Sequence, residues 1–171
     1  HNLGLCSNHL NDVPMGTPIR GALVKNKGFH FPKKAKEVIM ISTGTGIAPF
    51  LGMLQYNMSK VKTTLYWGGK DAPAFELYQN LLNEYAQEGK LHTIHTAFSQ
   101  ETEEKIYVQH LLQHHSTGLF QCLMNGGVIM LCGSINMQKD VIALLQHLCQ
   151  SQSLKPLSYY QNKGQLLMDC Y

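Results

Sequence analysis

The sequence predicts an α/β protein built on a doubly wound sheet of five parallel strands in the order 3-2-1-4-5. Two observations lead to this expectation. Short, β-branched apolar runs alternate with longer runs whose apolar residues recur at helical spacing, as in successive β–α–β units of a parallel sheet. A glycine-bearing turn also joins the first apolar run directly to a helical segment, at the edge where such sheets bind their ligands.

Each element has a signal of its own. Residues 37–42 form a short apolar run that fits a buried strand, and Gly89 is a suitable stop for the second helix. The last long helix repeats apolar residues such as Val141, Leu145 and Leu148 on one face. The expected strands are 37–42, 63–68, 91–97, 127–132 and 165–171, and the expected helices are 47–57, 74–88, 106–115 and 137–150.

The first 36 residues differ from the rest because proline and glycine interrupt any regular period. We therefore expect residues 1–35 to be the end of a preceding domain and residues 36–171 to be the main domain. Residues 19–24 could form one strand of a β structure in the first part. The N-terminus has neither an initiator methionine nor a signal-peptide pattern, so we expect a piece of a longer polypeptide.

Composition and charge exclude several classes of function. The formal net charge is +3, and the 14 basic residues are scattered apart from Lys33, Lys34 and Lys36. Nucleic acid is therefore not an expected partner. The longest apolar runs are far shorter than the roughly 20 residues that span a bilayer, so no membrane segment is expected in this chain.

Cysteine and histidine usage points away from disulfides and metals. The five cysteines form no C-x-x-C pair, and neither the pair His114-His115 nor His92 with His95 has the helical His-x-x-x-His spacing, so neither a disulfide framework nor a metal site is expected. Free thiols fit a reducing compartment. We expect a cytoplasmic location, although the longer protein could be attached to a membrane through segments outside this chain.

The turn after the first strand, Ser42-Thr43-Gly44-Thr45-Gly46-Ile47-Ala48-Pro49-Phe50, has the composition of an anion-binding site. Glycine lets the backbone approach a diphosphate, and the amides and positive dipole at the start of a helix favour its charge. No Gly-Lys-Ser/Thr follows, which argues against a Walker loop. A purely structural turn is the alternative. The residues assigned to cofactor binding here are Thr43, Gly44, Thr45 and Gly46.

The stretch Gly44-Thr45-Gly46-Ile47-Ala48-Pro49-Phe50 resembles the pyrophosphate-binding turn of the ferredoxin–NADP reductase superfamily. The rest of the chain resembles its diflavin branch, of the sulfite reductase flavoprotein type. The matches extend in the expected order over nearly all of the chain, so together they are far more specific than any one motif. They are Tyr66-Trp67-Gly68-Gly69-Lys70, Ala97-Phe98-Ser99, Lys105-Ile106-Tyr107-Val108-Gln109, residues 128–133 with Asn136-Met137, and Asp169-Cys170-Tyr171.

The resemblance implies a subsite for the adenosine half of NADPH. The residues implied to contact its 2′-phosphate and adenine are Ser99, Lys105, Tyr107 and Gln109. A hydroxyl, an ammonium group and a flat aromatic ring suit these partners. Gln100 replaces the arginine that the family usually has after the serine, which removes a bidentate cation and leaves NADH possible. Taken alone, the segment would be interpreted as a solvated loop with Lys105 merely exposed.

The resemblance also implies catalytic roles near the nicotinamide. Cys132 would position the ring, Asp169 would help to orient it, and Tyr171 would stack on FAD and move aside for the nicotinamide. The alternatives are a core cysteine, a surface carboxylate and a packed chain end. The further cofactor contacts implied are Gly133 and Met137 for the dinucleotide, and a glycine-containing turn of Gly4, Cys6 and Ser7 for the FAD diphosphate.

The expected function follows from the resemblance. The chain would be the NAD(P)H-binding module of a flavoprotein reductase, delivering hydride from NADPH, or NADH, to FAD for onward electron transfer to an acceptor domain or protein. Residues 1–35 would be the C-terminal remnant of the FAD-binding domain, so this chain alone should bind FAD weakly. The alternatives are a nucleotide-binding or sensing module without turnover, and a doubly wound domain with another ligand or only a structural role.

Overall fold

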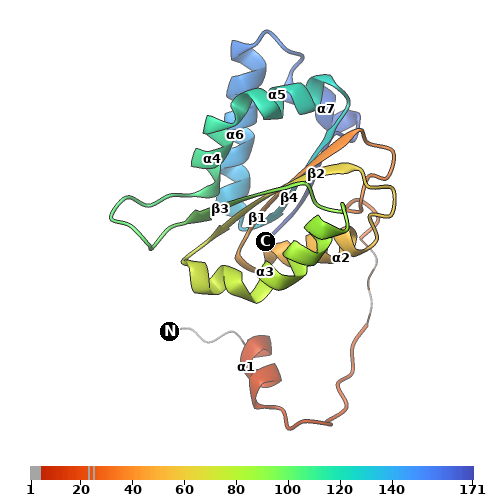
Figure 1. The fold of residues 1–171 in the computed structure, drawn as a ribbon, viewed down its shortest axis with the longest axis vertical. Helices are drawn as coiled ribbons and strands as arrows, with labels where there is room; N and C mark the ends of the chain where they lie inside the picture. Colours follow the sequence, from red (N-terminus) through yellow and green to blue (C-terminus); the bar gives the residue numbers. More distant parts are fainter. Residues whose placement is uncertain (1–4, 23, 25) are drawn as a thin grey trace.

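The computed structural model describes residues 5–22, 24 and 26–171. Five strands form one sheet in the order β3-β2-β1-β4-β5, and every neighbouring pair is parallel, which confirms the predicted fold class (Figure 1). The strands begin and end within two residues of most predicted bounds. They are β1 (Glu37–Thr43), β2 (Lys62–Gly69), β3 (Thr93–Phe98), β4 (Val128–Gly133) and β5 (Leu166–Cys170).

Helices cover both faces of the sheet. One face packs against α2 and α3, and the other packs against α4, α5, α6 and α7. Gly89, with φ of +70°, follows the C-terminal end of α3 as the predicted helix stop. The helices are α1 (Leu5–Asp12), α2 (Ala48–Gln55), α3 (Ala72–Gln87), α4 (Val108–His114), α5 (Ser116–Met124), α6 (Ile135–Ser151) and α7 (Leu157–Asn162), and a 3₁₀ turn, η1 (Gly44–Ile47), precedes α2.

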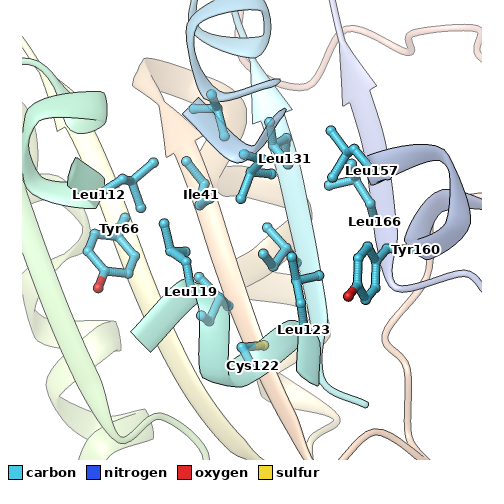
Figure 2. Close-up of a cluster of buried hydrophobic side chains, with 14 of the residues drawn as sticks. Ile41, Tyr66, Leu112, Leu119, Cys122, Leu123, Leu131, Leu157, Tyr160 and Leu166 are labelled. Atoms are coloured by element: carbon cyan, nitrogen blue, oxygen red, sulfur yellow. The ribbon is translucent and has the colours of Figure 1, made fainter. Parts of the chain in front are cut away.

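The central strands are buried on both sides because their side chains alternate between two hydrophobic clusters. In β1, Ile39 and Ile41 point to the α4–α7 face, whereas Val38 and Met40 point to the α2–α3 face. Figure 2 shows the cluster on the α4–α7 face, in which Leu119 of α5 lies over the strands. All four strand side chains are at most 4% exposed, so the sheet forms a rigid base for whatever lies at its edge.

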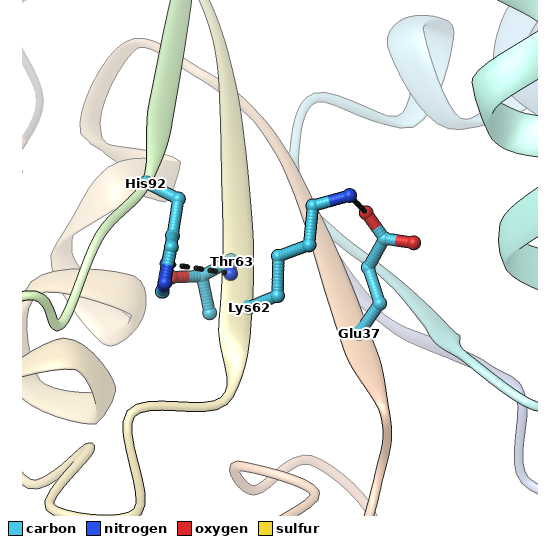
Figure 3. A network of polar contacts seen from close by, with 4 residues as sticks. All are labelled: Glu37, Lys62, Thr63 and His92. Atoms are coloured by element: carbon cyan, nitrogen blue, oxygen red, sulfur yellow. Dashed lines mark hydrogen bonds and ion pairs between the residues drawn. The ribbon is translucent and has the colours of Figure 1, made fainter.

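Polar contacts fix the N-terminal edge of the sheet (Figure 3). Lys62 Nζ lies 2.8 Å from Glu37 Oε1, and these two residues are register partners in β2 and β1. The Thr63 backbone amide donates to His92 Nδ1 at 3.2 Å. The buried Asn57 side chain donates to the Val61 and Lys90 carbonyls and accepts from the Val61 amide. These contacts hold the starts of three neighbouring strands in register.

Several local predictions were wrong. The helix expected over 106–115 begins only at Val108, and α5 and α7 were not predicted, because Ser116-Thr117-Gly118 and Pro156 resemble breaks in the pattern. Residues 19–22 and 24 form no strand. Cys6 and Ser7 lie in α1 rather than in a turn. Helices α5 and α7 pack in the α4–α7 cluster, so there the surroundings outweigh the local propensity.

The N-terminal segment contains two parts with different environments. Helix α1 lies away from the sheet (Figure 1), and the described residues between 6 and 22 are exposed or only partly buried. Phe29 and Phe31, in contrast, are buried in the α2–α3 cluster, and the Phe29 ring centroid lies 5.9 Å from that of Phe50. The domain boundary at 35/36 stays a prediction. No described helix is both long and apolar enough to cross a membrane.

Candidate functional site

A pocket of about 680 Å³ lies at the C-terminal ends of β1 to β4. This volume is in the usual range for small-molecule sites, and the position is where doubly wound sheets bind ligands. Its lining combines polar groups with the apolar side chains of Leu77, Tyr78 and Ile106. The predicted site residues that line it are Thr43, Gly44, Thr45, Ser99, Tyr107, Gln109 and Met137.

The glycine turn, residues Thr43–Gly46, adopts a left-handed conformation at Gly44. Gly44 has φ of +53°, and no atom lies within 4 Å of the position that a Cβ would occupy there, so glycine is needed for its backbone conformation. The indole Nε1 of Trp67 donates to the Gly44 carbonyl at 3.0 Å and fixes the turn against β2. The helix expected from residue 47 begins at Ala48, with Pro49 in its first turn as predicted, after the 3₁₀ turn Gly44–Ile47.

Gly46 does not line the pocket, although it belongs to the same motif. A Cβ at this position would lie 2.3 Å from the Cys132 carbonyl oxygen and 2.7 Å from Gly133 Cα. The turn therefore packs with its backbone directly against the end of β4. Glycine at position 46 is required for this close approach of two backbones.

Further contacts join the C-terminal ends of β1 and β4. Gly133 has φ of +139°, and a Cβ there would lie 2.4 Å from Thr43 Oγ1. The Ser134 amide donates to the same Thr43 hydroxyl at 3.1 Å, and the Ser134 hydroxyl accepts from the Met137 amide at 3.2 Å. Ser134 thereby caps α6, and the cap places Met137 in the pocket lining.

Cys132 is 3% exposed and does not line the pocket. Burial, and to a smaller extent the Asp169 carboxylate and the Cys170 thiol, raise the pKa of the Cys132 thiol to about 11. The thiol is therefore protonated at neutral pH, which does not suit a nucleophile. Asp169 is its register partner in β5 and is exposed. The two predicted catalytic residues are thus neighbours at the end of the sheet.

The backbone of Tyr171 is hydrogen-bonded to the C-terminal end of β4 and to the N-terminal end of α6. Its backbone amide donates to the Gly133 carbonyl at 2.9 Å, and its carbonyl accepts from the Ile135 amide at 3.2 Å. Its side chain is 70% exposed, yet its hydroxyl lies 2.9 Å from Thr45 Oγ1 in the glycine turn. Tyr171 therefore lies beside the turn and the Cys132–Gly133 segment without lining the pocket.

The other end of the pocket is formed by the segment after β3. Tyr107 is 42% exposed and precedes α4, with Gln109 in the first turn of that helix. Gln109 Nε2 donates to Asp140 Oδ2 at 2.9 Å. The Ser99 hydroxyl donates to the Gly69 carbonyl at 3.2 Å. Lys105 is exposed and does not line the pocket.

Sequence reasoning missed several lining residues. Lys70 and Asp140 supply the charged side chains of the lining, and neither was assigned to the site. Lys70 directly follows β2, so the rule that ligands lie at the carboxyl ends of parallel strands would have found it. Asp140 lies inside α6, and only the tertiary structure brings it to Gln109.

Comparison of the sequence with known proteins identifies the family of this chain. The family model described as "Oxidoreductase NAD-binding domain" matches residues 40–142, which is more than half of the chain and includes the glycine turn and the start of α6. The chain belongs to this family. It is an NAD(P)H-binding domain of the type found in flavoprotein reductases.

Curated relatives confirm the predicted resemblance to the diflavin branch. The sulfite reductase (NADPH) flavoprotein alpha-component of Neisseria meningitidis serogroup C is 37% identical over 132 residues, 74% of this chain and 22% of the relative. The same component of Shewanella oneidensis is 36% identical over 146 residues, 81% of this chain and 24% of the relative. Human NADPH–cytochrome P450 reductase is 31% identical over 164 residues, 86% of this chain and 24% of the relative. The chain spans about a quarter or less of the length of these relatives.

The pocket and the predicted FAD contacts lie in different parts of this NAD(P)H-binding domain. The pocket offers a glycine turn at one end and an exposed aromatic ring at the other. Of the predicted FAD contacts, Gly4 lies outside the described residues, Cys6 is exposed on α1, and the side chain of Ser7 lies outside the described part of the chain. Cys6 does not line the pocket at the ends of β1 to β4.

Two of the histidines meet on the α4–α7 face of the sheet. The His95 and His115 ring centroids lie 4.4 Å apart, and the Tyr66 hydroxyl lies 3.0 Å from His115 Nδ1. Burial, and then the proximity of His115, lower the pKa of His95. Among the residues that the structure describes, no three histidine, cysteine, aspartate or glutamate side chains are grouped as a metal site would need.

Proposed function

We propose that this domain binds NADPH, or NADH, in the pocket at the C-terminal ends of β1 to β4 and presents its nicotinamide to an FAD held by the longer protein. One observation carries the proposal. A single pocket joins the glycine turn Thr43–Thr45, which suits a diphosphate, to the exposed Tyr107 ring, which suits an adenine. The names of the relatives, which include NADPH and flavoprotein, support the same cofactors.

The adenosine half would bind at the Tyr107 end. The Tyr107 ring offers a face for stacking on adenine, and the Lys70 ammonium lies in the lining to meet phosphate charge. Ser99, Gln109 and Lys105 would contribute further polar contacts to a 2′-phosphate. Because Gln100 stands where the family has arginine, we propose that the preference for NADPH over NADH is modest.

The nicotinamide would lie beside the pocket, next to the Cys132–Gly133 segment, which does not line it. When bound, the dinucleotide supplies a hydride that FAD accepts, and the protein provides position and surroundings. Cys132, as a neutral buried thiol, would form an apolar floor beneath the ring, and Gly133 would leave room for it. Asp169 would stabilise positive charge on the ring. Tyr171 would cover the flavin face and move aside when the nicotinamide arrives.

The N-terminal part would belong to the flavin side. We propose that residues 1–35 are the C-terminal remnant of the FAD-binding domain and that Gly4, Cys6 and Ser7 contact the FAD diphosphate. An electron-acceptor domain or protein would then receive the electrons. The five cysteines are free, which supports a reducing compartment such as the cytoplasm.

The test is anaerobic rapid mixing of the full-length protein, loaded with FAD, with NADPH or NADH. The proposal expects loss of oxidised-flavin absorbance at a rate that saturates with dinucleotide concentration. Binding without flavin reduction would instead identify a nucleotide-sensing module. Absence of binding to either dinucleotide would contradict both.

A further inference from the structure

We propose that a second pocket, at the N-terminal ends of β4 and β5, binds a small phosphate monoester with an apolar body. Its volume is about 510 Å³, which is also within the usual range for small-molecule sites. Val128 at the start of β4 and Gln165 directly before β5 line it. Because β4 and β5 are parallel, it lies at the edge of the sheet opposite to the first pocket. The two pockets share no lining residue, so this proposal goes beyond the proposed function and does not depend on it.

Positive charge meets at this second pocket from two distant parts of the sequence. Lys33 and Lys34 lie in a turn before β1, Lys163 follows α7, and His30 adds an imidazole group. Among the described residues that line the pocket, none is an aspartate or a glutamate. Neither salt bridge in the described part of the chain includes one of these lysines. The three ammonium groups therefore lack a carboxylate in the lining.

Helix capping explains only part of this charge. Lys163 is the C-cap residue of α7, where a cation offsets the partial negative charge of the helix end. Its Nζ also lies 4.6 Å from the centroid of the Tyr159 ring. The ends of α5 and α7 each carry only about half a negative charge, which is less than three ammonium groups supply. Lys33 and Lys34 belong to no helix, so the pocket keeps an excess of positive charge that an anion can meet.

Apolar side chains form the rest of the surface that a ligand would contact. Phe31 and Val128 line the pocket and also belong to the α2–α3 cluster, with exposed fractions of 9% and 6%. The Ala35 amide donates to the Pro32 carbonyl at 2.9 Å, and this bond fixes the turn that carries the two lysines. The fold therefore holds the apolar surface and the lysines in place together.

The combination selects one class of ligand. A concave apolar surface with a few charged groups suits a small molecule, whereas a macromolecular partner usually needs a surface of about 800 Å². Ammonium groups bind phosphate and carboxylate oxygens. A phosphate monoester carries about two negative charges at neutral pH and a carboxylate carries one, so three lysines favour the phosphate.

The experiment is calorimetry of the full-length protein, loaded with FAD, with naphthyl phosphate as the probe. An excess of NADP⁺ keeps the probe out of the first pocket. Inorganic phosphate supplies the charge alone, naphthol supplies the apolar body alone, and naphthoate replaces the phosphate by a carboxylate. Naphthyl phosphate should bind at least about 10-fold more tightly than inorganic phosphate or naphthol. Naphthoate should bind less tightly than naphthyl phosphate.

Lysine variants locate the binding. Each exposed charge pair changes affinity by about 1.5- to 5-fold, so Lys33→Gln/Lys34→Gln should weaken naphthyl phosphate binding by about 2- to 30-fold. The matched control is Lys60→Gln/Lys139→Gln, which removes the same charge from exposed lysines that line neither pocket. The control should bind the probe as the wild type does. Lys163→Gln should weaken the probe further, and equal unfolding midpoints would show that the variants are folded.

Amine-reactive labelling with peptide mapping gives a second readout on the wild type. Bound naphthyl phosphate should slow the labelling of Lys33, Lys34 and Lys163 but not that of Lys60. Absence of saturable probe binding, or equal weakening by the two pairs of substitutions, would overturn the proposal. Inorganic phosphate that binds as tightly as the probe would remove the apolar body from it. Failure to bind dinucleotides would contradict the proposed function and leave this second site unaffected.

Discussion

The two ends of the pocket are built in different ways. At the switch-point end, which Thr43, Gly44 and Thr45 line, the turn behind the lining packs so closely on β4 that a Cβ at Gly46 would lie 2.3 Å from the Cys132 carbonyl oxygen. At the adenosine end, formed by the segment after β3 and by α3, Leu77 is 81% and Tyr107 is 42% exposed. At the first end, close backbone packing constrains the residue types. At the second end, partly exposed side chains can be replaced with less effect on the fold.

The largest effect should come from filling the switch-point end. Gly46→Ala should destabilise the domain by roughly 1–3 kcal/mol, because the added methyl group overlaps β4 backbone that cannot move freely. Gly52→Ala is the matched control, since no atom lies within 4 Å of its Cβ position in α2. It should stabilise the helix by up to about 1 kcal/mol. Denaturant unfolding of both variants measures the difference, and equal stabilities would remove the distinction between the two ends.

The opposite result is expected at the adenosine end. Tyr107→Ala should weaken binding of NADPH and NADH alike by about 5- to 100-fold, because stacking on a base contributes on the order of 1–3 kcal/mol. Its unfolding midpoint should stay close to that of the wild type because the ring is partly exposed. Tyr56→Ala is the control, since Tyr56 is 71% exposed and does not line the pocket. A large loss of stability in Tyr107→Ala would show that this ring stabilises the fold rather than serving only ligand binding.

Cofactor preference should change at the adenosine end by a single substitution. The Gln100 amide donates to the Lys70 carbonyl at 2.8 Å, so the backbone at this position is fixed next to a lining residue. Gln100→Arg should raise the ratio of NADPH to NADH affinity by about 10- to 100-fold, the value of one charge-assisted contact of roughly 1.5–3 kcal/mol. Gln100→Lys should gain less, because lysine lacks the bidentate geometry. An unchanged ratio of dissociation constants would mean that a 2′-phosphate does not reach this segment.

The smallest effect concerns pH at the switch-point end. The Cys132 thiol has its pKa raised from 9.0 to about 11, so the folded state holds a proton that the unfolded state releases between these pH values. Its contribution to stability is full below pH 9 and falls as the pH rises toward 11. Between about pH 6 and 8, dinucleotide affinity should therefore show no titration from Cys132. The check is to measure dinucleotide affinity of the wild type and of Cys132→Ser over this pH range. A change of affinity with pH that is present only in the wild type would indicate a thiolate.

The same contrast explains what could be predicted from the sequence. Strand β1 and the turn at Gly44 were found because buried runs and glycine turns are local signals. Helices α5 and α7 were missed because their packing against the sheet outweighs local breaks. That Gly46 faces β4, that Asp140 meets Gln109 and that Tyr171 meets Thr45 are tertiary facts. No spacing along the chain encodes them.

The most direct measurement of the central claim is a crystal structure of the domain with NADP⁺ bound. The account predicts diphosphate oxygens within hydrogen-bond distance of the turn Thr43–Thr45 and adenine stacked on Tyr107, with the adenosine half next to Ser99. A dinucleotide bound outside the pocket at the ends of β1 to β4, or one whose diphosphate does not touch that turn, would contradict it.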